Sequence, residues 1–233
     1  MAERDRPLLA VLIDADNVPA KHAEAILKEI AGIGEPALRR VYGDWSSEQL
    51  SGWTKHIRTL GLVAHQQTAN TKGKNASDIG LVIDAMDILH GRRFDGFVLV
   101  SSDSDFTALA NRMREDGLMV VGIGEKKTPE ALRNVCNRFI FIENITSEPE
   151  TRQIASDARQ LNEAFRLIAD TMDKIDQEGD WFNLGRIGGA LMAAHPDFDT
   201  RSYGHGKLSA LVKAMPRLES RQEGNILMVR RKD

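Results

Sequence analysis

Two uninterrupted apolar runs, LLAVLI at residues 8–13 and GFVLVS at residues 96–101, constrain the fold of this chain most strongly. A strand that alternates apolar and polar residues exposes one face to water. A strand that is apolar throughout is buried on both faces, which is typical of the centre of a parallel sheet with helices on either side. We therefore expect both runs to be central strands of an α/β domain.

The rest of the first 145 residues follows the same pattern, because short apolar segments alternate with longer amphipathic ones. The predicted strands cover residues 8–13, 37–42, 61–65, 95–101, 118–123 and 139–142, and the predicted helices cover residues 19–32, 46–59, 77–90, 104–116 and 129–137. This order predicts a parallel sheet flanked by helices.

In the predicted helix 77–90, the apolar residues allow a buried side to be assigned. We expect that side to consist of Ile79, Val82, Ile83 and Met86. Asp84 and Asp87 are then expected on the exposed side.

The chain changes character after residue 145. Residues 146–158, TSEPETRQIASDA, lose the apolar periodicity, as an interdomain linker would. Helices are predicted over 159–177, 184–194 and 205–215, and a hairpin that turns at residues 223–225 follows them. Three helices and a hairpin predict a small α+β module of the winged-helix type over residues 159–233.

Composition limits the compartment and the kind of binding. The single cysteine, Cys136, excludes an internal disulfide framework, so a reducing cytoplasmic compartment is expected. The apolar run near the start has only about six residues, too few for a signal-peptide core or a membrane-spanning helix, and no membrane association is expected. The net charge of −3 means that any nucleic-acid binding must be local.

Acidic residues directly follow both apolar runs. Asp14 lies in LIDADN, and Asp103 and Asp105 lie in VSSDSDF. Sites in open α/β sheets form outside the carboxyl ends of the strands, so these carboxylates converge if the two strands are neighbours. Asp78 opens the predicted helix 77–90, and Asn17 flanks the first acid. We therefore predict a site built from these five residues.

Several carboxylates at one rim repel one another, and a divalent cation removes that penalty. Ligation by oxygen alone suits Mg²⁺ or Mn²⁺. Such an ion can activate water and offset charge on a phosphodiester, so hydrolysis of a nucleic-acid backbone is the chemistry that follows. Which acid would act as general base is left open. A helix N-cap role is the alternative for Asp78 and for Asp105.

Residues beside the acids are candidates for contacts with a substrate. Lys72 and Lys74, on a polar loop before Asp78, could meet the phosphates of a nucleic-acid strand, or could belong to a solvated loop. Ser101, Ser102 and Ser104 could hydrogen-bond a phosphate or metal-bound water, or could cap a helix. A phosphate-binding glycine loop of the GxxxxGK[ST] type is absent from the sequence, which argues against nucleotide-dependent ATPase chemistry.

Three blocks of this sequence resemble the NYN domain, a branch of the PIN-like ribonuclease superfamily found in bacterial LabA-like (DUF88) proteins. The blocks are LIDADN, KNASDIGLVIDAMD and VLVSSDSDFTALANRMREDGLMVVGIG, in the family's order. The resemblance implies a Rossmann-like α/β fold in which Asp14, Asp78, Asp103 and Asp105 hold Mg²⁺ or Mn²⁺ for RNA cleavage. Asn17 matches the family's Asn after the first acid.

The C-terminal part, with FNLGRIGGAL and KLSALVKAMPRLE, resembles the OST-HTH or LOTUS domain. This resemblance implies binding to RNA, including structured G-rich RNA, and in some members to a protein partner. The basic residues that are candidates for RNA contact are Arg201, His205, Lys207, Lys213, Arg221, Arg230 and Arg231.

The expected organisation is therefore a nuclease domain at 1–145, a linker at 146–158 and an RNA-binding domain at 159–233. The expected function is metal-dependent hydrolysis of RNA phosphodiesters. The main alternative is a noncatalytic RNA-binding or regulatory adaptor with a vestigial acidic site, and a third is a phosphatase or DNA nuclease that uses the same acids. The sequence does not indicate the oligomeric state.

Overall fold

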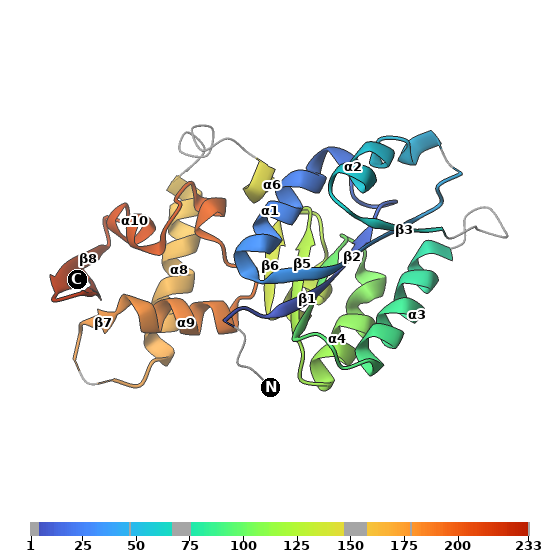
Figure 1. The fold of residues 1–233 in the computed structure, drawn as a ribbon. Helices are drawn as coiled ribbons and strands as arrows, with labels where there is room; N and C mark the ends of the chain where they lie inside the picture. The colour runs from blue at the N-terminus through green and yellow to red at the C-terminus, as the bar shows by residue number, and fades with distance from the viewer. Residues whose placement is uncertain (1–4, 47, 67–75, 147–157, 178, 233) are drawn as a thin grey trace. The chain divides into compact units, whose positions relative to one another are not determined.

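The computed structural model describes residues 5–46, 48–66, 76–146, 158–177 and 179–232 (Figure 1). The chain divides into two compact units, residues 1–146 and 147–233. Each unit is described by itself below.

The first unit is built on a six-stranded sheet in which every strand pairing is parallel. The strands are β1 (Leu8–Asp14), β2 (Glu35–Gly43), β3 (Val63–Gln66), β4 (Gly96–Val100), β5 (Met119–Gly124) and β6 (Arg138–Phe141), in the spatial order β3-β2-β1-β4-β5-β6. The two apolar runs are β1 and β4, which lie at the centre, as predicted, and the structure shows that they are neighbours. Strand β3 pairs only with residues 40–43 of β2, so it covers less than half of that strand.

Helices cover both faces of this sheet (Figure 1). The helices are α1 (Ala23–Ile33), α2 (Trp53–Thr59), α3 (Ala76–His90), α4 (Thr107–Glu115), α5 (Glu130–Val135) and α6 (Ile142–Thr146). One face, with Leu9, Val11 and Ile13 of β1, packs against residues of α1 and α2. The opposite face, with Ala10 and Leu12, packs against α3, α4 and α5. Because side chains alternate along a strand, Asp14 belongs to the face that α3 covers.

The buried side of α3 differs in part from the prediction. Leu81, Ala85 and Leu89 face the core. Of the predicted residues, Val82 and Met86 pack partly buried against that core, whereas Ile79 and Ile83 are 61% and 59% exposed. The helix is apolar on two sides, so its periodicity could not choose between them.

Asp84 lies on the side of α3 toward β2, where it accepts hydrogen bonds from Tyr42 and from Arg40, with which it also forms an ion pair. Its predicted exposed position is therefore wrong. The need of these two β2 side chains for an acceptor explains the difference. Asp87 is exposed, as predicted.

The second unit combines helices with a small antiparallel sheet of order β7-β9-β8. Its elements are α8 (Ala158–Lys174), β7 (Phe182–Asn183), α9 (Leu184–Ala194), η4 (Thr200–Tyr203), α10 (Leu208–Lys213), β8 (Leu218–Glu223) and β9 (Ile226–Arg231). The core includes Phe165 and Ile168 of α8, Ile187 of α9, Leu211 of α10 and Val229 of β9. The predicted hairpin is β8-β9, and the two-residue strand β7, which the sequence did not suggest, adds a third strand.

Among the described residues, no helix is long and apolar enough to cross a membrane.

Candidate active site at the carboxyl edge of the sheet

The central strands β1 and β4 end together at one edge of the sheet. They pair from Leu9 with Gly96 to Ile13 with Val100, so Asp14 and Ser101 are the next residues of the two strands. The chain continues from β1 to β2 and β3 on one side of the sheet, and β4, β5 and β6 lie on the other side. The strand order therefore reverses between β1 and β4. Ligand sites of open α/β sheets lie at such points.

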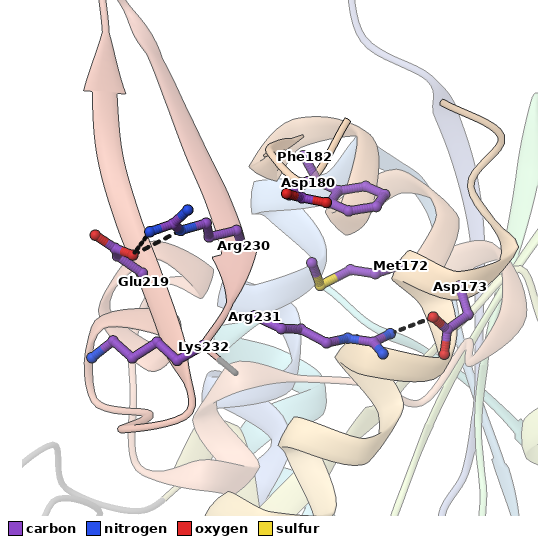
Figure 2. A pocket seen from close by; sticks show the side chains of 8 residues that line it. All are labelled: Met172, Asp173, Asp180, Phe182, Glu219, Arg230, Arg231 and Lys232. Atoms are coloured by element: carbon purple, nitrogen blue, oxygen red, sulfur yellow. Dashed lines mark hydrogen bonds and ion pairs between the residues drawn. The ribbon is translucent and has the colours of Figure 1, made fainter. Parts of the chain in front are cut away.

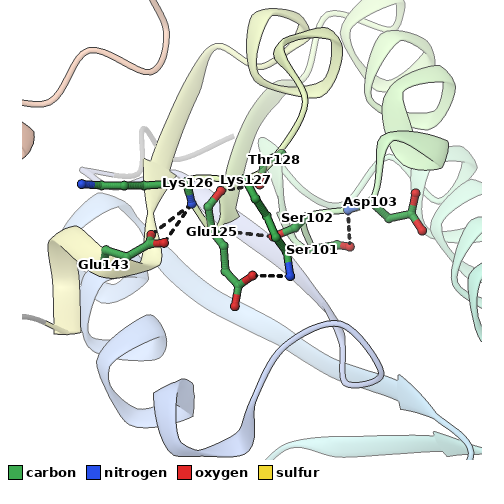
Figure 3. Close-up of polar contacts among 8 residues, drawn as sticks. All are labelled: Ser101, Ser102, Asp103, Glu125, Lys126, Lys127, Thr128 and Glu143. Carbon is green, nitrogen blue, oxygen red and sulfur yellow. Dashed lines mark hydrogen bonds and ion pairs between the residues drawn. The ribbon is translucent and has the colours of Figure 1, made fainter.

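Asp14 is the buried centre of this site. It is only 1% exposed. The Ser101 hydroxyl donates to its Oδ2 at 2.8 Å, and the backbone N–H of Asn17 donates to its Oδ1 at 3.3 Å. Ser101 in turn accepts a hydrogen bond from the backbone N–H of Asp103 at 3.1 Å (Figure 3). The Ser101 hydroxyl therefore connects the acid after β1 with the loop after β4.

The carboxylates of the site influence one another's pKa values. Burial is the main cause that raises the pKa of Asp14 to about 6; the Ser101 hydrogen bond lowers it, while the negative charges of Asp78 and Asp16 raise it further. Burial also raises the pKa of Asp78, and the charges of Asp103, Asp16 and Asp105 add to that effect. The charge of Asp78 thus acts on Asp14, and the charges of Asp103 and Asp105 act on Asp78.

The charge of Asp16 acts on both Asp14 and Asp78, and Asp16 was not predicted as a site residue. Ser101 was predicted either to bind phosphate or metal-bound water or to cap a helix; in the structure its hydroxyl donates to Asp14. Asp103 is the N-cap of the short helix η3 (Ser104–Phe106). Its side chain accepts a hydrogen bond from the backbone N–H of Asp105 at 2.9 Å. Asp78 is the third residue of α3 and Asp105 lies inside η3, so neither is an N-cap.

The donor set fits a hard divalent cation. Asp14, Asp78 and Asp103 form no ion pair with a cationic side chain in the part of the chain that the structure describes. A buried carboxylate with no cationic partner is costly, and carboxylate oxygens are what Mg²⁺ and Mn²⁺ prefer. Over the same residues, no three His, Cys, Asp or Glu side chains lie close enough to hold an ion in the present conformation. Partly exposed Asp78 and Asp103 would have to turn toward Asp14.

Ser102 is part of the scaffold of the site. It is buried, and its hydroxyl accepts the backbone N–H of Glu125 at 2.9 Å, which ties the end of β4 to the loop after β5 (Figure 3). That loop is also held by the Glu143 carboxylate, which accepts the backbone N–H of Lys126 at 3.0 Å, and by the Thr128 hydroxyl, which donates to the Glu125 carbonyl at 2.6 Å. Ser102 therefore has a structural role, and its contact with RNA stays a prediction.

The remaining candidates for RNA contact lie elsewhere. Lys72 and Lys74 fall outside the described residues. Arg201 is half-buried, and its Nε and Nη2 donate to the Asp199 carboxylate at 2.9 and 2.7 Å. Because that carboxylate also accepts the Arg201 backbone N–H, Arg201 stabilises η4 and is left out of the RNA-binding surface proposed below.

His205, Lys207, Lys213 and Arg221 are at least partly exposed on the second unit.

Burial of Asp14 predicts a pH-dependent stability cost. An acid whose pKa is higher in the folded than in the unfolded protein loses its contribution to stability as the pH rises, here from about 4 through about 6. In metal-free protein, Asp14→Asn should therefore raise the free energy of unfolding by about 1–3 kcal/mol at pH 7.5, because one pKa unit corresponds to 1.36 kcal/mol. The Ser101 hydroxyl can accept from the new amide.

Thermal unfolding of parent and variant in EDTA at pH 5 and pH 7.5 measures this effect. The difference between the two proteins should grow with pH. An Asp14→Asn protein that is less stable than the parent at both pH values would contradict it.

Comparisons with known proteins match two family models and one solved structure. The family model of the NYN domain matches residues 8–143, and the model of the OST-HTH/LOTUS domain matches residues 152–228. A solved structure of a protein of unknown function from Vibrio parahaemolyticus RIMD 2210633 is similar at 20% sequence identity and a TM-score of 0.48, over 60% of this chain and 94% of that chain. No curated protein matches.

Proposed function

The chain belongs to the NYN family, whose domain is of the PIN-like nuclease type, and it also carries an RNA-binding OST-HTH/LOTUS domain; from this we propose that it is a divalent-metal-dependent ribonuclease. In this proposal residues 1–145 form the nuclease domain, residues 146–158 the linker, and residues 159–233 the domain that binds the substrate RNA.

The observation that carries the proposal is the buried carboxylate of Asp14, which has acidic neighbours and no cationic partner among the described residues. A carboxylate that serves only the fold would be expected to pair with a base or to lie in water. Here burial raises the pKa of Asp14, and the charges of Asp78 and Asp16 raise it further. A cation at this edge would relieve the repulsion and place a phosphate beside it.

Each residue of the site has a part in this proposal. Asp14, Asp78, Asp103 and Asp105 would hold Mg²⁺ or Mn²⁺, and such an ion, when bound, supplies activated water and charge stabilisation for the scissile phosphodiester. The Ser101 hydroxyl and the Asn17 backbone N–H fix the orientation of Asp14.

The OST-HTH/LOTUS domain would retain the RNA near the site. Its exposed candidates are His205, Lys207, Lys213 and Arg221. Cations on one surface bind the phosphate backbone with little dependence on sequence, so we expect the affinity to fall as the salt concentration rises.

A cleavage assay of the full-length protein tests the proposal. We expect labelled single-stranded RNA to be cut in Mn²⁺ or Mg²⁺ and to remain intact in EDTA, with activity restored when the ion is added back. Duplex RNA, G-quadruplex RNA and single-stranded DNA of the same length define the substrate class. RNA that is bound tightly but never cut with either ion would overturn the nuclease proposal and leave a noncatalytic RNA-binding adaptor.

A further inference from the structure

An indole ring with two guanidinium groups beside it marks the small sheet of the second unit. Trp181 directly precedes β7. The guanidinium carbons of Arg221, on β8, and Arg230, on β9, lie 4.0 and 4.8 Å from the centroid of its ring. Both distances are within the range of cation–π attraction. Residues from three separate segments therefore form one group, called here the Trp181 cluster.

Both arginines of this cluster are available to a ligand. Arg230 donates through Nε to the Glu219 carboxylate at 2.8 Å, and Arg221 pairs with Glu223. All four side chains of these pairs are 41–50% exposed. Exposed ion pairs contribute only about 0–1 kcal/mol, so a phosphate can replace the carboxylate at little cost. Stacking on the indole meanwhile limits the freedom of both guanidinium groups.

A pocket of about 490 Å³ adjoins the cluster through Arg230 (Figure 2). Met172 and Phe182 supply apolar wall, and Arg231 and Lys232 supply positive charge. The Arg231 side chain is held by the Asp173 carboxylate at 2.7 Å, whereas Lys232 forms no ion pair with any carboxylate of the described residues. Acidic Asp173, Asp180 and Glu219 also line the pocket. Its volume is in the range of pockets that bind small organic ligands, so one nucleotide fits.

We propose that the Trp181 cluster is a base-stacking platform for unpaired RNA and that the adjoining pocket receives a neighbouring nucleotide. The inference rests on the proposed RNA binding of the second unit and names the residues that carry it. Single-strand binders combine aromatic faces, on which bases stack, with cationic groups along the backbone, and arginine planes stack on bases as well. Because bases inside a duplex have no free face, the platform selects single-stranded over duplex RNA.

RNA binding by the full chain tests this inference. The chain carries Asp103→Asn so that the probe is not cut, and the probe is a 12-nucleotide single-stranded oligo(A) RNA with a fluorescent label, followed by anisotropy. Trp181→Ala should weaken binding roughly 5- to 150-fold, the range for losing one base–aromatic stack. Trp181→Phe, which keeps an aromatic face, should retain most of the affinity. A difference in affinity between the Ala and Phe variants separates loss of the aromatic face from a simple folding defect.

Charge variants separate the platform from general electrostatics. Arg221→Gln should weaken binding and reduce its dependence on salt. Arg186→Gln is the matched control, since Arg186 is an exposed arginine of α9 outside the cluster. If Trp181→Ala binds the probe as tightly as the parent, or if Arg186→Gln weakens binding as much as Arg221→Gln, the platform does not exist.

Failure of the platform and failure of the nuclease proposal give different results. Cleavage by the chain with Asp103 intact, together with an unchanged KM in Trp181→Ala, would leave a nuclease without this platform. Binding that depends on Trp181 without any cleavage would establish the platform on a noncatalytic protein.

Discussion

Replacing Asp14 or Asp103 by asparagine is expected to lower the rate of metal-dependent RNA cleavage by at least about 100-fold. Each change removes one negative charge from the carboxylate group while keeping the size and shape of the side chain. A bound cation contributes several kcal/mol to stabilisation of the transition state, and each 1.36 kcal/mol corresponds to tenfold in rate. The measurement is the single-turnover cleavage rate on labelled RNA at saturating Mn²⁺.

The control for these variants is Asp87→Asn. Asp87 is an exposed acid on α3, the same helix that carries Asp78, and its replacement should leave the rate within a factor of two. Binding of uncut RNA should be nearly unchanged in all three variants, because the proposed RNA-binding surface is in the second unit. Asp103→Asn protein that cleaves at the parent's rate would exclude the proposed site.

Asp84→Ala is expected to cause the largest loss of stability among changes near the site, about 2–4 kcal/mol in the free energy of unfolding. The Asp84 carboxylate accepts the Tyr42 hydroxyl and pairs with Arg40, so its removal leaves a buried hydroxyl and a half-buried cation without their acceptor. Burial and the neighbouring carboxylate both raise the pKa of Tyr42, so the hydroxyl stays protonated as a donor.

Chemical denaturation measures this loss, with Asp87→Ala as the matched control on the exposed side of the same helix. Asp84 holds α3 against β2, and α3 also carries Asp78. Cleavage should therefore fall together with stability in Asp84→Ala and remain unchanged in Asp87→Ala. An Asp84→Ala protein as stable as its control would show that the contacts of Arg40 and Tyr42 contribute little.

The sequence predicts most of the sheet because its strands differ in composition from its helices. Runs such as LLAVLI can be buried on both faces only at the centre of a sheet, and β1 and β4 do lie there as neighbours. The proximity of the two strand ends, which carry Asp14 and Ser101, follows from that placement. Strand β7 escaped prediction because two residues are too few to show any alternation.

What the sequence did not predict depends on contacts between distant segments. Two sides of α3 are apolar, and only the presence of Arg40 and Tyr42 on β2 decides that Asp84 faces the sheet. The role of Ser102 depends on the backbone of Glu125, 23 residues away. The Trp181 cluster likewise requires β9 to pair with both β7 and β8, which brings two arginines to an indole far earlier in the chain.

The short strand β3 has a consequence for how this protein behaves at high concentration. Residues 35–39 of β2 pair with β1 on one side, and β3 begins only opposite Arg40, so the other side of this segment has no strand partner among the described residues. Such an open edge is a template for edge-to-edge association between chains. Pro36 has no N–H to offer, Glu35 adds charge, and Arg39 reaches across to donate to the Leu60 carbonyl at 3.0 Å. These three features are of the kind that make an edge a poor template for a strand of another chain, so we expect the sheet to end early without edge-to-edge association.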